Sequence, residues 1–251
     1  MHVVQVCGYH QSGKTTTVKE LISRLKTAGN SVASIKDIHS EGFVLDQPNK
    51  NSYVHKTAGA NPVVIRSEAE TDFLYNYQMD FLDIVHKISV DWLVVEGLSE
   101  FPLPKIVCGK TEQEVDDFLD RRTFAISGVI SNKKKEYRGL PVFNPLVAEQ
   151  ANKLWELVMV KVFPMLPYVD EKCCDLCGLT CAQMVEAIIQ GEKTYQDCLI
   201  NRTNVHLKIG DRDIPIVPFV QNILKNNVMA LVSEIDGWEE GKNIEIKLES
   251  R

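Results

Sequence analysis

Eight residues near the start of the chain have the spacing of a phosphate-binding loop. The stretch GYHQSGKT, from Gly8 to Thr15, fits G-x-x-x-x-G-K-[ST] at every fixed position. Gly8 and Gly13 allow backbone conformations that turn successive N–H groups toward phosphate oxygens. In such a loop the lysine, here Lys14, contacts the β- and γ-phosphates, and the Thr15 hydroxyl binds Mg²⁺. The spacing therefore predicts a nucleotide site that includes a divalent metal.

A carboxylate further along the chain is the expected partner of that metal. The run DWLVVEG, residues 91–97, is too short for a helix and is typical of a fully buried strand. Glu96 lies at its carboxyl end, where the active sites of parallel sheets gather, and would hold Mg²⁺ directly or through water. Asp91, at the start of the run, is the alternative. His10, inside the phosphate loop, is expected to contact the ligand.

Two further segments are candidates for binding the nucleotide. The polar segment 38–56 carries Asp46, Lys50 and Ser52 without core periodicity, so it is either a switch-like or substrate-binding loop or a solvated one. Asn132 and the lysine after it follow a buried strand, as in guanine-binding loops. The aspartate expected two residues beyond that lysine is itself a lysine here.

Four of the seven cysteines lie in EKCCDLCGLTC, residues 171–181. With Cys198, the thiolates of Cys174, Cys177 and Cys181 could hold either a [4Fe–4S] cluster or tetrahedral zinc. Zinc sites more often pair two Cys-x₂-Cys motifs, and only one is present, which favours iron–sulfur over zinc or a site without metal. The spacing resembles a four-iron module written Cys-x₂-Cys-Gly-x₃-Cys with a distant fourth cysteine, although one residue is missing here. Cys173 is a spare ligand.

The segments around these residues alternate between strand and helix patterns. Apolar, β-branched runs predict strands at 2–8, 31–37, 62–66, 91–97 and 123–131. Helical spacing of apolar residues predicts helices at 14–29, 77–88, 145–158 and 181–191. This alternation predicts an α/β fold of the P-loop NTPase type, with a mostly parallel sheet and helices on both faces.

Prolines at 164 and 167 mark a boundary near residue 168. We expect a P-loop nucleotide-binding domain over 1–167, a four-cysteine metal or iron–sulfur module over 168–200, and a small α+β extension over 201–251. A Gly-Asp pair between alternating runs predicts a hairpin in that extension. A helix and then a strand at 243–250 are expected to follow it.

Composition narrows the class of partner and the compartment. A net charge of −6 argues against nucleic acid as a binding partner. The sequence contains no run of eighteen apolar residues, so we expect no transmembrane helix. The N-terminus has neither the basic nor the apolar region of a signal peptide, so we expect a cytoplasmic protein. Thiols stay reduced there, which favours metal ligation over disulfides.

Several of these motifs resemble those of a known family. GYHQSGKTT, SIKDIH, DWLVVEG, PKIVC and SGVISN occur in the order seen in the molybdopterin-guanine dinucleotide biosynthesis protein B (MobB) family, over residues 2 to about 160. The resemblance implies a GTP-binding protein with slow GTP hydrolysis. It would assist the guanylyltransferase that attaches GMP to molybdopterin, giving the dinucleotide form of the molybdenum or tungsten cofactor. Molybdopterin itself is a second candidate ligand, and a homodimer is the expected oligomer.

The resemblance also assigns roles by position. Lys14 and Glu96 would be the catalytic residues of any GTP hydrolysis. The expected nucleotide- and metal-binding residues are Gly8, His10, Gly13, Lys14, Thr15, Thr16, Asp46, Lys50, Ser52, Glu96, Gly97 and Asn132.

The chain departs from the family pattern at three positions. Asp37 replaces the first histidine of a Lys-His-x-x-His stretch that includes Lys36 and His39, and Asn49 and Asn51 replace a glycine and an aspartate. These changes favour slow turnover or plain binding, so we expect at most a weak GTPase.

Two other classes of protein stay open. One is a nucleotide-dependent metal-insertion chaperone or redox sensor, in which the cysteines carry or sense the metal. The other is a P-loop small-molecule kinase, which would need an arginine-rich lid. Only Arg121 and Arg122 could supply that lid.

Overall fold

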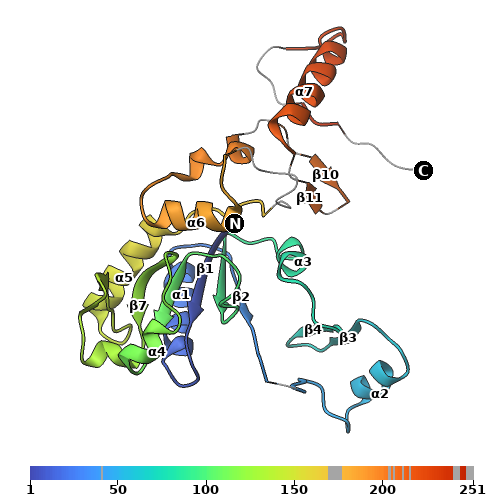
Figure 1. Cartoon of the computed structure of the whole chain (residues 1–251). Coiled ribbons are helices and arrows are strands. Elements are labelled where there is room, and N and C mark those ends of the chain that lie inside the picture. The colour runs from blue at the N-terminus through green and yellow to red at the C-terminus, as the bar shows by residue number, and fades with distance from the viewer. Residues whose placement is uncertain are drawn as a thin grey trace.

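The computed structural model of the chain describes residues 1–40, 42–168, 177–202, 205, 207–210, 212–214, 216–239 and 244–246 (Figure 1). Within these residues the largest sheet has five parallel strands in the spatial order β2-β5-β1-β6-β7. They are β1 (His2–Cys7), β2 (Val32–Lys36), β5 (Trp92–Glu96), β6 (Lys105–Cys108) and β7 (Thr123–Ser127). The mostly parallel sheet expected from the sequence is confirmed.

Helices bury both faces of this sheet. On one face, α1 (Lys14–Thr27) and α5 (Ala148–Lys161) share a hydrophobic cluster with Val4, Val6 and Val94. On the other face, α3 (Phe81–His86) packs in the cluster of Val3, and α4 (Glu112–Asp116) in that of Val107. All residues of β5 are buried because the strand is paired on both edges and covered on both faces. This explains why its sequence is a continuous apolar run.

Local sequence sets the extent of α1. Val18, Leu21 and Leu25 recur at helical spacing and are buried against the sheet. The helix stops before Gly29, which has a φ of +84°. The Gly29 N–H donates to the carbonyl of Lys26, and the next N–H donates to that of Leu25. This Schellman motif satisfies the last carbonyls of the helix.

Between β2 and α3 the chain forms an arm that stands away from the sheet (Figure 1). It contains α2 (Asn51–Thr57), β3 (Val63–Arg66) and β4 (Thr71–Leu74). The strand expected at 62–66 is present, but it pairs antiparallel with β4 and does not join the parallel sheet. The loop expected over 38–56 is wrong at its end, because α2 is helical. No residue of α2 is buried, so it lacks the apolar periodicity that would have predicted it.

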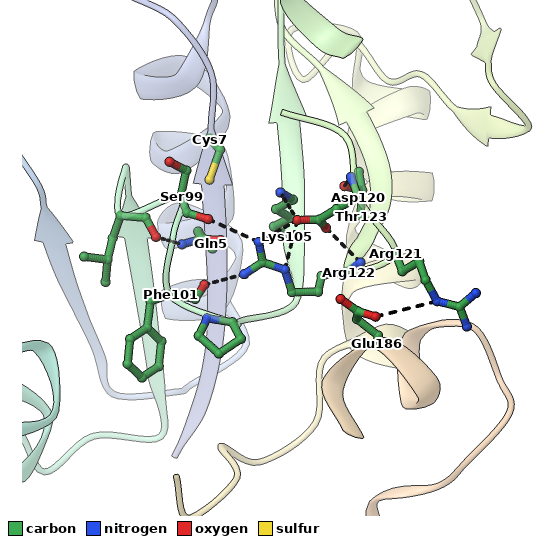
Figure 2. Close-up of polar contacts among 12 residues, drawn as sticks. Gln5, Cys7, Ser99, Phe101, Lys105, Asp120, Arg121, Arg122, Thr123 and Glu186 are labelled. Atoms are coloured by element: carbon green, nitrogen blue, oxygen red, sulfur yellow. Dashed lines mark hydrogen bonds and ion pairs between the residues drawn. The ribbon is translucent and has the colours of Figure 1, made fainter. Parts of the chain in front are cut away.

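The connection from β5 to β6 is a strap, residues 97–104, without a helix. Both strands neighbour β1 and all three are parallel, so the strap returns from the carboxyl edge of the sheet to its amino edge across β1. Its carbonyl oxygens are held by side chains (Figure 2). Arg122 donates to Phe101 at 2.6 Å and to Ser99 at 3.2 Å, and Gln5 donates to Leu98.

Asp120 forms ion pairs with two cations beneath the strap. Its Oδ2 lies 2.5 Å from Nη2 of Arg122 and 2.7 Å from Nζ of Lys105, whose side chain is buried (Figure 2). Burial alone would raise the pKa of Asp120, but the hydrogen bonds from Arg122 and Lys105 outweigh burial and leave that pKa below its ordinary value. The carboxylate therefore stays ionised and holds both cations in place.

After α5 the chain meets the amino edge of the sheet, where β1 and β7 begin. There α6 (Cys181–Ile189) starts at a capping box formed by Thr180 and Gln183. Arg121, just before β7, approaches Glu186 of α6 to 3.7 Å (Figure 2). The segment with the described cysteines is thus attached at the edge opposite to the phosphate loop.

Short elements complete the described part of the C-terminal segment. They are η2 (Tyr195–Asp197), η3 (Leu199–Arg202), β10 (Leu207–Ile209), β11 (Arg212–Ile214) and α7 (Pro218–Val232). The hairpin and the helix after it are confirmed. The final strand expected at 243–250 is absent from residues 244–246, the part that is described, and no strand pairs with them there. The alternating pattern is not enough without a partner strand.

The strand expected over 123–131 is too long. It stops at Ser127 because Gly128 has a φ of +86°, and a 3₁₀ turn, η1 (Val129–Asn132), follows. A short hairpin of β8 (Glu136–Tyr137) and β9 (Leu140–Pro141) precedes α5. Of the helices in the described ranges, none has both the length and the apolarity to cross a membrane.

Candidate nucleotide-binding site

The phosphate loop lies at the carboxyl edge of the parallel sheet, between β1 and α1. The connection after β1 leads to β2 on one side, and the connection after the neighbouring strand β6 leads to β7 on the other, so the two connections run in opposite directions. Ligands of open α/β sheets bind at such a point. The N-terminus of α1 adds unpaired N–H groups and a partial positive charge, both of which favour phosphate.

Glycines let the loop pack backbone against backbone on the neighbouring strands. Gly8 has a φ of +143°, and a Cβ there would lie 2.0 Å from the carbonyl oxygen of Cys108 at the end of β6. Gly13, with a φ of +100°, faces Gly128, which follows β7. A Cβ on Gly128 would lie 2.0 Å from the carbonyl oxygen of Ser12. The shape of the loop therefore depends on the ends of β6 and β7 as well as on its own residues.

The metal side of the site is formed by Thr15 and Glu96. The Thr15 hydroxyl is 3.2 Å from each carboxylate oxygen of Glu96, which ends β5 and is 8% exposed. Lys36, the last residue of β2, pairs in register with Glu96 and has its Nζ 3.1 Å from Oε1. Hydroxyl and carboxylate oxygens are the ligands that Mg²⁺ prefers, with phosphate oxygens and water completing its shell. The donor set therefore fits Mg²⁺.

Other residues of the loop face its solvent side. Nζ of Lys14 donates to the carbonyl oxygen of Tyr9 at 2.6 Å, which keeps the ammonium over the loop. His10 and Thr16 are exposed, and the His10 carbonyl accepts a hydrogen bond from Lys110 at 3.4 Å. The Lys14 ammonium and the backbone N–H groups of the loop are the groups that would meet a polyphosphate.

Gly97 follows Glu96 directly and has a φ of +97°. A Cβ at Gly97 would lie 3.1 Å from Cβ of Asp37, so a larger residue would push the end of β2 away. The Asp37 carboxylate accepts a hydrogen bond from the N–H of Leu98 at 3.2 Å and lies 3.0 Å from Nε2 of His39. Asp37, where the chain departs from the family motif, and Gly97, where it keeps it, thus meet at the carboxyl edge of the sheet.

The polar residues of the arm are not brought to the phosphate loop in this arrangement. Ser52 donates to Asp46 at 2.8 Å, and Lys50 is exposed at the start of α2, which lies away from the sheet (Figure 1). Their part in nucleotide binding stays a prediction, which would require the arm to approach the site.

Asn132 and Asp91, the remaining candidates, lie near opposite edges of the sheet and each accepts hydrogen bonds from a neighbouring residue. Asn132 is exposed at the end of η1 and accepts a hydrogen bond from the Asn144 amide at 3.0 Å. Asp91 precedes β5 at the opposite edge, where it accepts hydrogen bonds from the hydroxyl and N–H of Ser31. Those bonds lower the pKa of Asp91 and give it a structural role. Glu96 is the acid at the phosphate loop.

Three of the four predicted cluster ligands are described. Cys177 and Cys181 are half-buried and Cys198 is buried, and all three belong to or pack against the hydrophobic cluster that also contains α6. Cys174 and the spare Cys173 lie outside the described residues. Among the residues that are described, no three His, Cys, Asp or Glu side chains are grouped so as to hold a metal ion.

Cys7 and Cys108, the two cysteines near the phosphate loop, are buried and unreactive. Burial raises the pKa of Cys7 to about 11 and that of Cys108 to about 12. Both thiols therefore stay protonated near neutral pH, where the thiolate is the reactive form.

Sequence reasoning missed the residues that support the loop from elsewhere in the chain. Gly128 was not among the expected site residues, and Lys36 was placed in a motif without a role. The Ser-Gly pair directly after a buried strand was the available signal for Gly128. Nothing local in the sequence indicates that Lys36 meets Glu96, because the contact depends on the pairing of β2 with β5.

The strand order, the phosphate loop and the acid at the end of the adjacent strand define a P-loop nucleotide-binding fold. Within that class, the chain belongs to the molybdopterin guanine dinucleotide synthesis protein B (MobB) family, whose model matches residues 3–132. The resemblance found in the motifs is therefore confirmed.

Known relatives extend the match. A Haemophilus influenzae molybdopterin-guanine dinucleotide biosynthesis adapter protein is 28% identical over 124 residues, covering 45% of this chain and 69% of that protein. A Methanocaldococcus jannaschii relative, named for the same adapter role, is 26% identical and spans 99% of this chain and 98% of its own length. The crystal structure of Bacillus subtilis MobB has the same fold, with a TM-score of 0.52 at 22% identity, covering 62% of this chain and 98% of that one.

Proposed function

We propose that this chain is a GTP-binding adapter protein in the formation of molybdopterin guanine dinucleotide. The observation that carries the proposal is the contact between Thr15 of the phosphate loop and buried Glu96, at 3.2 Å, within a chain of the MobB family. Three relatives bear names with the adapter role, which supports the same role here.

In this proposal each part of the site has a distinct task. The loop amides and Lys14 bind the phosphates, Thr15 and Glu96 hold Mg²⁺, and Asn132 contributes to the choice of guanine. Hydrolysis is at most weak. Asn51 stands where the family motif has a carboxylate, and in this arrangement the arm lies away from the site (Figure 1).

The proposed macromolecular partner is the guanylyltransferase that joins GMP to molybdopterin. We expect that adding the chain to that enzyme, molybdopterin and Mg²⁺–GTP raises the yield of the dinucleotide, measured by chromatography. The matched control is Lys14→Ala, which keeps the protein surface but removes the phosphate contact, and should give no increase. An unchanged yield with the wild-type chain would refute the adapter role.

We also propose that Cys174, Cys177, Cys181 and Cys198 hold a [4Fe–4S] cluster. Support comes from their spacing and from the packing of the three described cysteines on one hydrophobic cluster at the amino edge of the sheet. Protein purified without oxygen should be brown and contain about four iron atoms per chain, the content of one such cluster. Cys198→Ser should lower the iron content, whereas Cys108→Ser should not. Colourless protein with one zinc would contradict the iron–sulfur assignment.

The homodimer expected from the sequence also stays a proposal, which sedimentation equilibrium can test. The arm offers a candidate contact surface because several of its large apolar side chains are exposed: Phe43, Val44, Leu45, Val54, Val64 and Phe73. Apolar side chains gathered on one projecting segment are typical of a protein interface.

A further inference from the structure

Lys36 occupies a defined place relative to the phosphate loop. It ends β2, Glu96 ends β5, and the two residues are direct neighbours in the parallel register. β5 pairs in turn with β1, which ends at Cys7. The phosphate loop begins at the next residue, Gly8. Because adjacent strands lie about 4.8 Å apart, Lys36 starts about 10 Å from β1, a span that a lysine side chain can largely cover.

The contacts of Lys36 direct its charge toward the metal side of the site. Its Nζ is 3.1 Å from Oε1 of Glu96, and the same oxygen is 3.2 Å from the Thr15 hydroxyl. The ammonium therefore contacts one predicted metal ligand, Glu96, and lies within two hydrogen-bond lengths of the other, Thr15. This places a lysine other than Lys14 at the metal side of the loop.

The two partners differ in exposure to solvent. The Glu96 side chain is 10% exposed and is held by both Thr15 and Lys36, whereas the Lys36 side chain is 60% exposed. The carboxylate is thus fixed by packing, while the ammonium can turn toward a ligand without disturbing the core. A solvated lysine gains most from a highly charged acceptor such as a terminal phosphate.

We propose that Lys36 is the residue that distinguishes a nucleoside triphosphate from the diphosphate at this site. The inference rests on the proposed nucleotide-binding function. The loop amides and Lys14 would bind the phosphates beside the start of α1, and Thr15 and Glu96 would hold the metal. A cation beside the metal-binding carboxylate would face the γ-phosphate, which only the triphosphate carries.

The alternative role for Lys36 is to position Glu96 alone. Mg²⁺ accompanies both nucleotides, so loss of a purely positioning lysine would weaken triphosphate and diphosphate binding together. Loss of a contact to the γ-phosphate would weaken triphosphate binding only. The ratio of the two affinities therefore separates the roles.

The test is calorimetric titration of the full chain with a non-hydrolysable GTP analogue and with GDP, both with Mg²⁺. Lys36→Met keeps the apolar stem and removes the charge. We expect it to lower the affinity for the triphosphate about tenfold or more, the size of one charge-assisted hydrogen bond. Its affinity for GDP should stay within about twofold, since no contact to GDP is lost.

Two variants sharpen the outcome. Lys36→Arg keeps the charge and should restore most of the triphosphate preference, whereas Lys19→Met, on the exposed side of α1, should change neither affinity. Equal weakening of both nucleotides, or no weakening of either by Lys36→Met, would overturn this inference and leave the proposed function intact. Failure of the wild-type chain to bind either nucleotide would overturn the proposed function itself.

Discussion

Gly128→Ala is expected to abolish nucleotide binding, although Gly128 lies more than a hundred residues after the phosphate loop. The added Cβ would sit 2.0 Å from the carbonyl oxygen of Ser12, inside the loop. The backbone at Gly128, with φ 86° and ψ −157°, is also in a region that is almost restricted to glycine. Strain and clash together should lower the free energy of unfolding by about 3 kcal/mol.

A matched control separates the clash from the backbone strain. Gly139 has a φ of +74°, but a Cβ there would meet no atom within 4 Å. Gly139→Ala should therefore cost only about 1 kcal/mol, the usual penalty of a left-handed backbone, and leave nucleotide binding unchanged. Urea unfolding and nucleotide titration of both variants test this pair. If Gly128→Ala behaves like Gly139→Ala in both measurements, the packing of the loop on β7 does not shape the site.

Lys14→Ala is the second large effect that we expect. Lys14 is the one side chain of the loop with a full positive charge at the predicted position of the β- and γ-phosphates. Loss of its charge-assisted hydrogen bonds should weaken GTP binding by about a hundredfold or more. The unfolding midpoint should hardly change, because its described hydrogen bond is to the carbonyl of Tyr9 at a partly exposed position.

The control for Lys14 is another lysine beside the same loop. Nζ of Lys110 lies 3.4 Å from the His10 carbonyl and 3.1 Å from Glu114. Its charge is already paired with that carboxylate, so Lys110→Ala should reduce GTP affinity by less than about threefold, as for a surface charge. Similar losses in the two variants would indicate a general charge effect instead of a specific phosphate contact.

The parts of the site that could be predicted from sequence are those set by local residues. The phosphate loop is eight consecutive residues, and the strand before it and the helix after it follow from short apolar patterns. Glu96 was placed at the loop because a buried parallel strand must end at the same edge as its neighbours. The loop, its flanking elements and the strand that ends at Glu96 each follow from residues next to one another in the sequence.

The parts that could not be predicted depend on pairings between distant segments. Lys36 meets Glu96 only because β2 lies beside β5, and Gly128 meets Ser12 only because the chain after β7 returns to the loop. β6, α4 and β4 were not expected, since each is only four or five residues long and gives a weak periodic signal. The strap could not be foreseen either, because its carbonyls are held by Arg122, which precedes β7, and by Gln5 of β1.

The position of the cysteine segment also depends on a pairing between distant residues. Its spacing could be read from the sequence, but not its attachment at the amino edge of the sheet through Arg121 and Glu186. The phosphate loop lies at the carboxyl edge of the same strands.

The most direct test of the account is one calorimetric titration series of the wild-type chain with Mg²⁺–GTP and Mg²⁺–ATP. We predict one GTP bound per chain, with higher affinity than ATP. No binding of either nucleotide would contradict the proposed site at Gly8–Thr15 and Glu96. Equal affinity for both would contradict the guanine assignment that joins this chain to dinucleotide formation.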